Sequence, residues 1–166
     1  DAFLFCCYAG MRYSDFTNLS KKNIVDINQE TWLIYKSVKT GTEVRLPLYL
    51  LFAGKGIVIL NKYRNNLEDF FRLRDNSNIN KDLIIIAKLA GLSKKISFHT
   101  ARHTNATLLI YNGVNITTVQ KLLGHKSVKT TQVYTNIMDM TIVHDLEKIK
   151  QAALGIKKKT DNSFNK

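Results

Sequence analysis

Cysteine is scarce in this chain of 166 residues, and long apolar runs are missing. The two cysteines, Cys6 and Cys7, are adjacent within an apolar run, so the pattern indicates neither a disulfide framework nor a zinc knuckle. That run, Ala2–Ala9, is too short to span a bilayer and lacks the basic start of a signal peptide. We therefore expect reduced, buried thiols, a cytoplasmic location and no membrane partner.

Acidic residues are also few, at 13 Asp and Glu against 25 Lys and Arg, which gives a net charge of +12. The 45% apolar and 10% aromatic content fits a folded domain rather than a disordered chain. A folded domain this basic favours an anionic partner, most often nucleic acid, although a merely basic, soluble protein has the same composition. The sequence has no P-loop and no clustered acidic ligands, so we expect no cofactor, no metal and no small-molecule substrate.

Residue spacing predicts an α+β domain, mainly α, with a small antiparallel β-sheet inserted early. Strand character is concentrated in residues 24–27, 31–38 and 44–46, and Thr40-Gly41-Thr42 predicts a tight hairpin turn. The one proline, Pro47, ends the last of these strands. Helices are predicted over residues 2–9, 11–19, 48–63, 81–90, 98–111, 116–123 and 139–154, with a turn or short helix over 128–135 and an irregular stretch over 65–80.

The stretch from His99 to Tyr134 combines residue types that suit phosphodiester chemistry. His99 and Arg102 are three residues apart at the start of a predicted helix, so their side chains share one face. Arginine offers a planar fork of donors that matches two phosphate oxygens, and histidine exchanges a proton near neutral pH. His125 follows a helix stop in a basic loop, nine residues before Tyr134. A tyrosine nucleophile needs activation by a base or by positive charge, and these neighbours could supply both.

Each of these pieces also has an ordinary structural explanation. A His-x-x-Arg pair occurs at solvated helix starts, and LGHKSVKTT reads equally as a plain basic turn. His99 and His103 have the four-residue spacing of a metal-binding pair, but no glutamate lies between them and no third ligand is evident. His103 is therefore interpreted as a packed, supporting histidine.

The combination is much more specific than its parts. HTARHTNAT, followed by GVNITTVQKLLGHKSVKTTQVYTNI, resembles the C-terminal half of the catalytic domain of tyrosine recombinases, the phage-integrase family. AGMRYSDFTNLSKKNI resembles the first arginine box of that family, and KTGTEVRLPL resembles its β-hairpin with the catalytic lysine. The three boxes occur in the family's order over residues 1 to about 153. The KTG and RYSD forms are most similar to integrases of mobile elements from Bacteroides-type bacteria.

The resemblance implies which residues are catalytic. Arg12 matches the first arginine of the family, and Asp15 matches the supporting acidic residue behind it. Lys39 matches the hairpin lysine because it lies eight residues before Pro47, and Lys36 is the alternative. The His-x-x-Arg box, the position that is His or Trp in the family, and the nucleophile correspond to His99, Arg102, His125 and Tyr134, with His103 as a further supporting residue.

The resemblance also implies a chemistry. Tyr134 would attack a DNA phosphodiester and form a 3′-phosphotyrosine, while the two arginines and His125 stabilise the charge on the phosphate oxygens. Lys39 would protonate the leaving 5′ oxygen, and His99 would manage the tyrosine proton. Two other activities stay open: DNA relaxation of the type IB topoisomerase kind, and DNA binding by the same fold without catalysis.

The domain and its partners are implied in the same way. Residues 1–156 would form the catalytic domain, and residues 157–166 a flexible basic tail. The DNA-clamping domain of the family and an opening catalytic-domain helix would lie outside this chain. The partners would be double-stranded DNA and further copies of the protein, in a tetramer on DNA joined through the C-terminal helix, whose apolar stripe comprises Ile142, Leu146, Ile149, Ala153 and Ile156. The protein would act in the bacterial cytoplasm, on the nucleoid.

Overall fold

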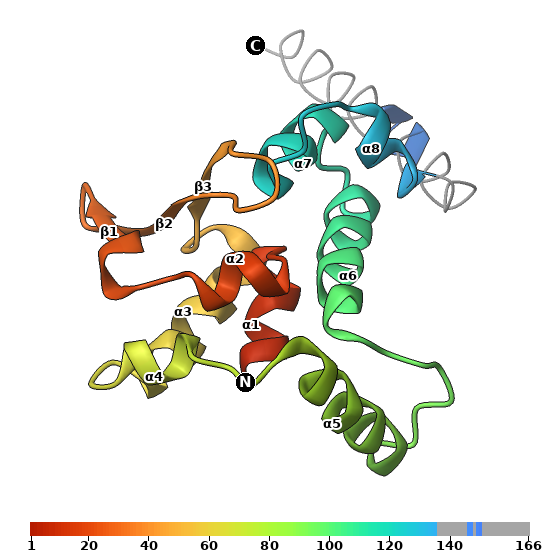
Figure 1. The fold of residues 1–166 in the computed structure, drawn as a ribbon. Helices are drawn as coiled ribbons and strands as arrows, with labels where there is room; N and C mark the ends of the chain where they lie inside the picture. The colour runs from red at the N-terminus through yellow and green to blue at the C-terminus, as the bar shows by residue number, and fades with distance from the viewer. Residues whose placement is uncertain (136–145, 148, 151–166) are drawn as a thin grey trace, which may run out of the picture.

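A computed structural model describes residues 1–135, 146, 147, 149 and 150, and it confirms a mainly helical fold with a small sheet near the beginning (Figure 1). Its helices are α1 (Ala2–Ala9), α2 (Tyr13–Thr17), α3 (Lys55–Lys62), α4 (Leu67–Phe71), α5 (Asn76–Leu89), α6 (Phe98–Tyr111), α7 (Ile116–Leu123) and α8 (Lys129–Gln132). Two 3₁₀ turns, η1 (Lys21–Asn23) and η2 (Leu51–Gly54), and the strands β1 (Ile24–Ile27), β2 (Glu30–Lys36) and β3 (Glu43–Pro47) complete the described elements.

Helix α1 lies at the centre of the molecule, packed against α6 on one side and α3 on another (Figure 1). It has no polar face, because every residue of AFLFCCYA is apolar or a tyrosine, and such a helix is stable only when it is covered all round. Gly10 ends it in the left-handed conformation, with φ of 68°. The Asn105 side chain of α6 donates hydrogen bonds to the carbonyl oxygens of Cys7 and Tyr8 in α1. Helices α1 and α6 are therefore joined by hydrogen bonds in addition to their apolar contacts.

An aromatic cluster forms the core beside α1. Phe16 of α2 contacts Phe5, Phe70, Phe71 and Phe98, with ring centroids between 5.4 and 6.2 Å apart. All four pairs are tilted or edge-to-face, which is the arrangement that aromatic rings prefer. The cluster therefore fixes α2, and with it the residues on either side of α2, against α1 and the start of α6.

The three strands form an antiparallel sheet in the order β1-β2-β3. Leu33 of β2 pairs with Leu46 of β3, and Tyr35 pairs with Val44. These residues are buried, whereas their neighbours along the strands are more exposed, as expected when one face of a sheet covers a core. The predicted hairpin turn lies between β2 and β3, and Pro47 is the last residue of β3.

The helices that carry the His99–Tyr134 stretch begin and end where the sequence predicts. Ser97 and Thr100 form a reciprocal capping box at the start of α6. The Asn115 side chain accepts a hydrogen bond from the Thr117 amide at the start of α7, and Gly124 ends α7 with φ of 63°. Local signals are sufficient here because every capping contact joins residues at most five positions apart.

Three predictions were wrong. Residues 48–63 do not form one helix, because Phe52 and Ala53 adopt left-handed backbone angles and separate η2 from α3. The stretch 65–80 is not irregular: α4 occupies its first part, and α5 begins at Asn76 rather than at Lys81. The DNSN run expected to be a loop is the first turn of α5, because the Asp75 side chain accepts a hydrogen bond from the Asn78 amide.

Other predictions fall on parts of the chain that are not described. The helix over 139–154 lies largely outside the described residues, and the tail over 157–166 lies wholly outside them. Among the helices that are described, none is long and apolar enough to cross a membrane.

Candidate active site

Arg102 is the anchor of the site. It lies on α6 with only 1% of its surface exposed, and it holds the ends of two other helices. Its Nη1 donates to the Gly10 carbonyl oxygen at 2.7 Å, and its Nη2 donates to the Leu123 carbonyl oxygen at 2.6 Å. These are the carboxyl ends of α1 and α7, where exposed carbonyls carry partial negative charge and stabilise a cation. Burial, and secondarily Arg12, lower the Arg102 pKa to about 10, so the guanidinium stays charged at neutral pH.

Arg12 precedes α2 and is tied to the β-hairpin. Its Nη1 donates to Ser37 Oγ at 3.2 Å and to Asp15 Oδ2 at 3.4 Å. The Asp15 carboxylate is buried and also accepts from Ser37 Oγ at 3.3 Å and from the Val38 amide at 2.8 Å. A buried carboxylate with this many donors is a fixed structural anion. Asp15 therefore connects the first arginine to the strand that leads to Lys39.

Lys39 lies at the exposed tip of the β2–β3 hairpin and lines a cleft of about 410 Å³ together with Arg12, Tyr13, Ser14, Asn76 and His99. The hairpin is held toward α7 because Thr40 Oγ1 donates to the Gly124 carbonyl oxygen at 3.1 Å. Lys36 is exposed at the end of β2, and its side chain lies alongside Gly41 instead of lining the cleft. The geometry therefore favours Lys39 over Lys36 as the lysine of the site.

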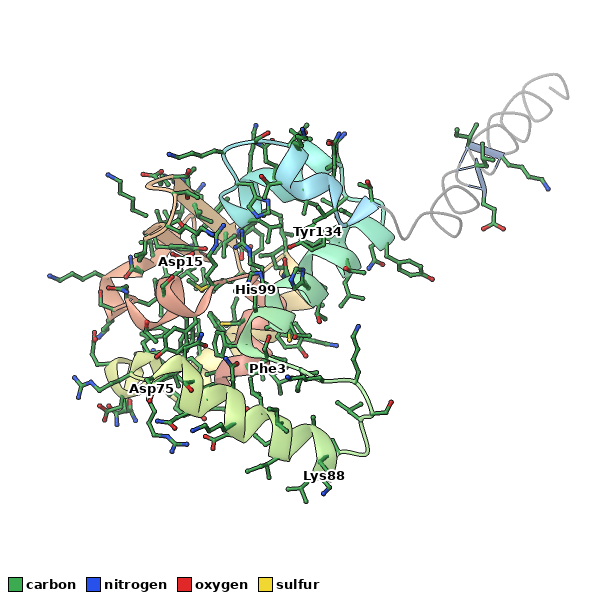
Figure 2. The ribbon with its side chains drawn as sticks, turned by 45° about the vertical axis from the view of Figure 1, so that its right-hand side comes forward. Phe3, Asp15, Asp75, Lys88, His99 and Tyr134 are labelled. Carbon is green, nitrogen blue, oxygen red and sulfur yellow. The ribbon has the colours of Figure 1, made fainter. Side chains whose placement is uncertain are left out.

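Two histidines, His99 and His103, lie between this cleft and Tyr134 in a chain of ring contacts. Figure 2 labels His99 and Tyr134. The rings of His99 and His103 meet edge-to-face with centroids 4.5 Å apart, and the His103 ring lies 5.4 Å from that of Tyr134. Desolvation lowers the His99 pKa, and His103, Arg102, Arg12 and Lys39 lower it further. Tyr134 is 7% exposed, and burial raises its pKa while the two arginines oppose that rise.

His125 follows α7 directly and is buried. Its Nδ1 lies 2.9 Å from Thr131 Oγ1, and Gln120 Nε2 donates to its carbonyl oxygen at 3.0 Å. Burial lowers the His125 pKa to about 4, with Arg102, Arg12 and His99 adding to the effect. The ring is thus neutral at pH 7. If Nδ1 accepts from the Thr131 hydroxyl, Nε2 carries the proton and is a neutral donor.

All of the sequence-predicted site residues meet in one region, built from five segments of the chain. Cationic groups and hydrogen-bond donors predominate there, and the buried Asp15 is committed to Arg12, Ser37 and Val38. Burial is the main cause of the lowered pKa values of His99, Arg102 and His125, and the neighbouring positive charges lower them further. Such a site is suited to a phosphate group. Among the described residues, no group of three His, Cys, Asp or Glu side chains could hold a metal ion.

Several supporting residues were not predicted. Ser37 joins Arg12 to Asp15, Thr131 holds the His125 ring, and the carbonyl of Gly10 holds Arg102. Gly10 could have been noticed as a helix-ending glycine two residues before Arg12. Ser37 and Thr131 carry no signal of their own, since serine and threonine near a turn usually serve that turn.

Comparison with known proteins identifies the family of the chain. The profile of the phage integrase family matches residues 1–140. Tyrosine recombinase XerC of Rickettsia prowazekii (strain Madrid E) is 30% identical over 159 residues, which are 90% of this chain and 49% of the relative. Tyrosine recombinase XerA of Saccharolobus solfataricus (strain ATCC 35092 / DSM 1617 / JCM 11322 / P2) is 34% identical over 134 residues, 78% of this chain and 42% of the relative.

Solved structures show the same fold. The crystal structure of XerA recombinase superposes with a TM-score of 0.70 and 27% identity, over 89% of this chain and 56% of that one. A lambda integrase tetramer bound to a Holliday junction superposes with a TM-score of 0.65 and 22% identity, over 80% of this chain and 40% of that one. This chain therefore belongs to the phage integrase family. It spans about half the length of the curated relatives that it matches.

Proposed function

We propose that this chain is the catalytic part of a site-specific DNA recombinase that cuts and rejoins strands through a covalent 3′-phosphotyrosine. The observation that carries the proposal is the burial of Tyr134 beside a cluster of cationic side chains, in a chain of the phage integrase family. A phenol in that position has both a phosphate-binding surface and proton-accepting histidines within the same site. The basic charge of +12 and the similarity to a lambda integrase tetramer bound to a Holliday junction support DNA as the substrate.

In the proposed reaction, Tyr134 Oη attacks the phosphorus and gives its proton to His99. The bond from phosphorus to the 5′ oxygen breaks, and that oxygen takes a proton from Lys39. The products are a 3′-phosphotyrosine and a free 5′-hydroxyl. A 5′-hydroxyl from a partner duplex then reverses the step and rejoins the strands. One ester replaces another in each half-reaction, so no nucleotide is needed to supply bond energy.

Transition-state charge on the non-bridging oxygens would be stabilised by Arg12, Arg102 and the Nε2–H of His125. Two Arg102 donors are already held by helix carbonyls, so this guanidinium keeps its orientation before DNA arrives. Donors that are fixed in advance cost little reorganisation at the moment of reaction, and each is worth roughly 10²–10³ in rate. Arg12 is held by Ser37 and Asp15 in the same way.

The raised Tyr134 pKa fits a nucleophile that is inactive without DNA. In the free protein the phenol keeps its proton, because burial disfavours the phenolate. We propose that His99 acts as the base in the complex and that His103, whose ring contacts both the His99 ring and the Tyr134 ring, orients both. Bound phosphate would raise the depressed pKa of His99, since an anion beside a histidine favours its protonated form.

We further propose that the protein acts as a tetramer on DNA in the bacterial cytoplasm, with the segment after Tyr134 docking into a neighbouring copy. The titles of solved relatives describe a lambda integrase dimer and tetramer bound to DNA, which supports assembly of this kind. The KTG hairpin and the RYSD box support an origin in a mobile element of Bacteroides-type bacteria. Sequencing the DNA that flanks the gene would test that origin, since recognisable mobile-element ends should lie there.

Covalent trapping tests the proposed reaction. A pool of nicked DNA duplexes with randomised flanks is incubated with the protein in EDTA, so that cleavage releases a short 5′-hydroxyl fragment and cannot be reversed. We expect a protein–DNA adduct that resists SDS, and sequencing of the trapped DNA would identify the target. The adduct should be lost in Tyr134→Phe and kept in Tyr111→Phe, a matched change at the exposed end of α6. An adduct that survives Tyr134→Phe, or no adduct with the unaltered protein, would refute the proposal.

The recovered target then separates recombination from relaxation. Two duplexes carrying it should yield Holliday junctions when mixed with the protein. Relaxation of a supercoiled plasmid without junctions would instead indicate a topoisomerase-like activity of the same nucleophile.

A further inference from the structure

Tyr35 has a feature that the proposed reaction does not use. Its Oη is buried and, within the part of the chain that the structure describes, forms no hydrogen bond. The residue as a whole is 5% exposed. Burying a hydroxyl without a partner destabilises a fold, and a phenylalanine would fill the same space without that cost. A tyrosine at this position therefore needs an explanation other than packing.

The position of Tyr35 points toward the phosphate-binding side chains. Side chains alternate along a strand, so Leu33, Tyr35 and Ser37 face the same way, and all three are buried. Ser37 is the residue that bridges Arg12 and Asp15. Tyr35 thus lies on the inner face of the sheet, two residues before Ser37 and on the same side of the strand.

The charges around the Tyr35 hydroxyl are those of the proposed site. Burial raises its pKa well above the ordinary value, Asp15 raises it further, and Arg102 and Arg12 oppose the rise. The phenol is therefore protonated at neutral pH. The charged side chains that act on it include one carboxylate, Asp15, and two guanidinium groups, Arg102 and Arg12. Arginine only donates and a carboxylate only accepts, whereas a phenol does both. Ser37 already does both for Arg12. Tyr35 could do the same for Arg102, by accepting from its guanidinium and donating to Asp15.

We propose that Tyr35 is a positioning residue for the arginine pair, completing an Arg102–Tyr35–Asp15 hydrogen-bond chain when the scissile phosphodiester binds. In the absence of substrate, hydrogen bonds of a catalytic site are often long and close only in the complex. Phosphate binding would draw the free donors of Arg102 and Arg12 toward the cleft. The Tyr35 hydroxyl would then help the Gly10 and Leu123 carbonyls to keep Arg102 in its orientation, while Asp15 holds Arg12.

The test is Tyr35→Phe, which removes the hydroxyl alone. This inference rests on the proposed function, so the same nicked duplex and the same adduct are used, under single-turnover conditions with saturating DNA. We expect cleavage to slow about 10-fold, less than for loss of a direct phosphate donor. We expect the DNA dissociation constant to stay within about twofold, because Tyr35 does not touch DNA. The melting temperature should stay the same or rise by about 2–4 °C, because the unpartnered hydroxyl is gone.

Tyr63→Phe is the matched control. Its hydroxyl donates to Asp1 at 2.9 Å, away from the cleft, so its removal should leave the cleavage rate unchanged. Cleavage by Tyr35→Phe within twofold of the unaltered rate would overturn the inference. A slower rate accompanied by a lower melting temperature or weaker DNA binding would also overturn it, because it would show a packing role. Both results leave Tyr134-dependent cleavage by the unaltered protein intact, so they are distinct from failure of the proposed function.

Discussion

Gly10 provides a quantitative test of how Arg102 is held. Gly10 has φ of 68°, and its carbonyl oxygen accepts from Arg102 Nη1. A Cβ at this position would lie 2.6 Å from Asn105 Oδ1 and 2.9 Å from Leu123 Cδ2, both too close for real contacts. Gly10→Ala therefore combines backbone strain with a steric clash at the junction of α1, α6 and α7.

Gly91 offers a matched control that contains the strain without the clash. Its φ is 70°, and a Cβ there would meet nothing within 4 Å. An alanine in the left-handed region costs about 1 kcal/mol, and this should be the whole effect of Gly91→Ala. Overpacking a well-filled site adds about 1–3 kcal/mol, so Gly10→Ala should cost about 2–4 kcal/mol. For a domain of this size the two changes correspond to losses of about 3 °C and 6–12 °C in melting temperature.

Urea denaturation followed by circular dichroism measures both free energies of unfolding. The cleavage rate should also fall in Gly10→Ala by more than the unfolded fraction explains, because the displaced carbonyl oxygen accepts the hydrogen bond that holds Arg102. In Gly91→Ala the rate of the folded fraction should not change. Equal destabilisation by the two substitutions, or unchanged cleavage by folded Gly10→Ala, would refute the argument that this glycine sets the position of Arg102.

Three further predictions concern charge and backbone strain. His125 has a folded-state pKa of about 4 against an ordinary value of 6.5, so between these pH values the unfolded chain binds a proton that the folded chain does not. The neutral ring therefore contributes fully to stability above about pH 6.5, and this contribution falls by about 1–2 kcal/mol, after discounting for solvent screening, as the pH drops toward 4. His125→Asn should reduce this pH-dependent loss of the free energy of unfolding, measured by urea titrations at several pH values. An unchanged dependence of that free energy on pH would contradict the prediction. Asp15→Asn should lower the free energy of unfolding by about 2 kcal/mol and slow cleavage, because the buried anion that holds Arg12 is lost. Asp26→Asn, at an exposed position of β1, should change neither the stability nor the cleavage rate. Equal effects of the two substitutions would count against a special role for Asp15. Ala53→Gly should stabilise the protein by about 0.5–1 kcal/mol in urea denaturation, because φ of 54° strains an exposed alanine; a loss of stability would show that no strain is stored there.

Local signals in the sequence determined the elements that carry half of the site. Helices α6 and α7 have the predicted bounds, since their caps use residues at most five positions apart, including a glycine that ends α7. The hairpin turn and the end of β3 at Pro47 are equally local. Motif order and resemblance predicted the identity of the site residues, and the packed structure brings those residues together in one region.

The elements that were predicted wrongly depend on particular contacts. Helix α5 starts at Asn76, five residues before the predicted start, because the Asp75 side chain caps it. The polar residues that follow Asp75 are also typical of a loop, and for this reason the cap was not predicted. The break between η2 and α3 requires left-handed angles at Phe52 and Ala53, two residue types that rarely adopt them. Here the Phe52 ring packs on Tyr8, with centroids 5.7 Å apart, and this tertiary contact accompanies the unfavourable backbone.

Sequence alone thus determined the helices, the hairpin, the basic charge and the residue types available for phosphate chemistry. Only the tertiary structure decided how they are held. Arg102 bonds to a carbonyl 92 positions away, and Asp15 bonds to an amide 23 positions away. The depressed pKa of His125, and the buried Tyr35 hydroxyl that has no partner among the described residues, likewise exist only when distant segments exclude water from them. The physical reason is that burial and charge proximity are properties of the packed chain, which no local pattern encodes.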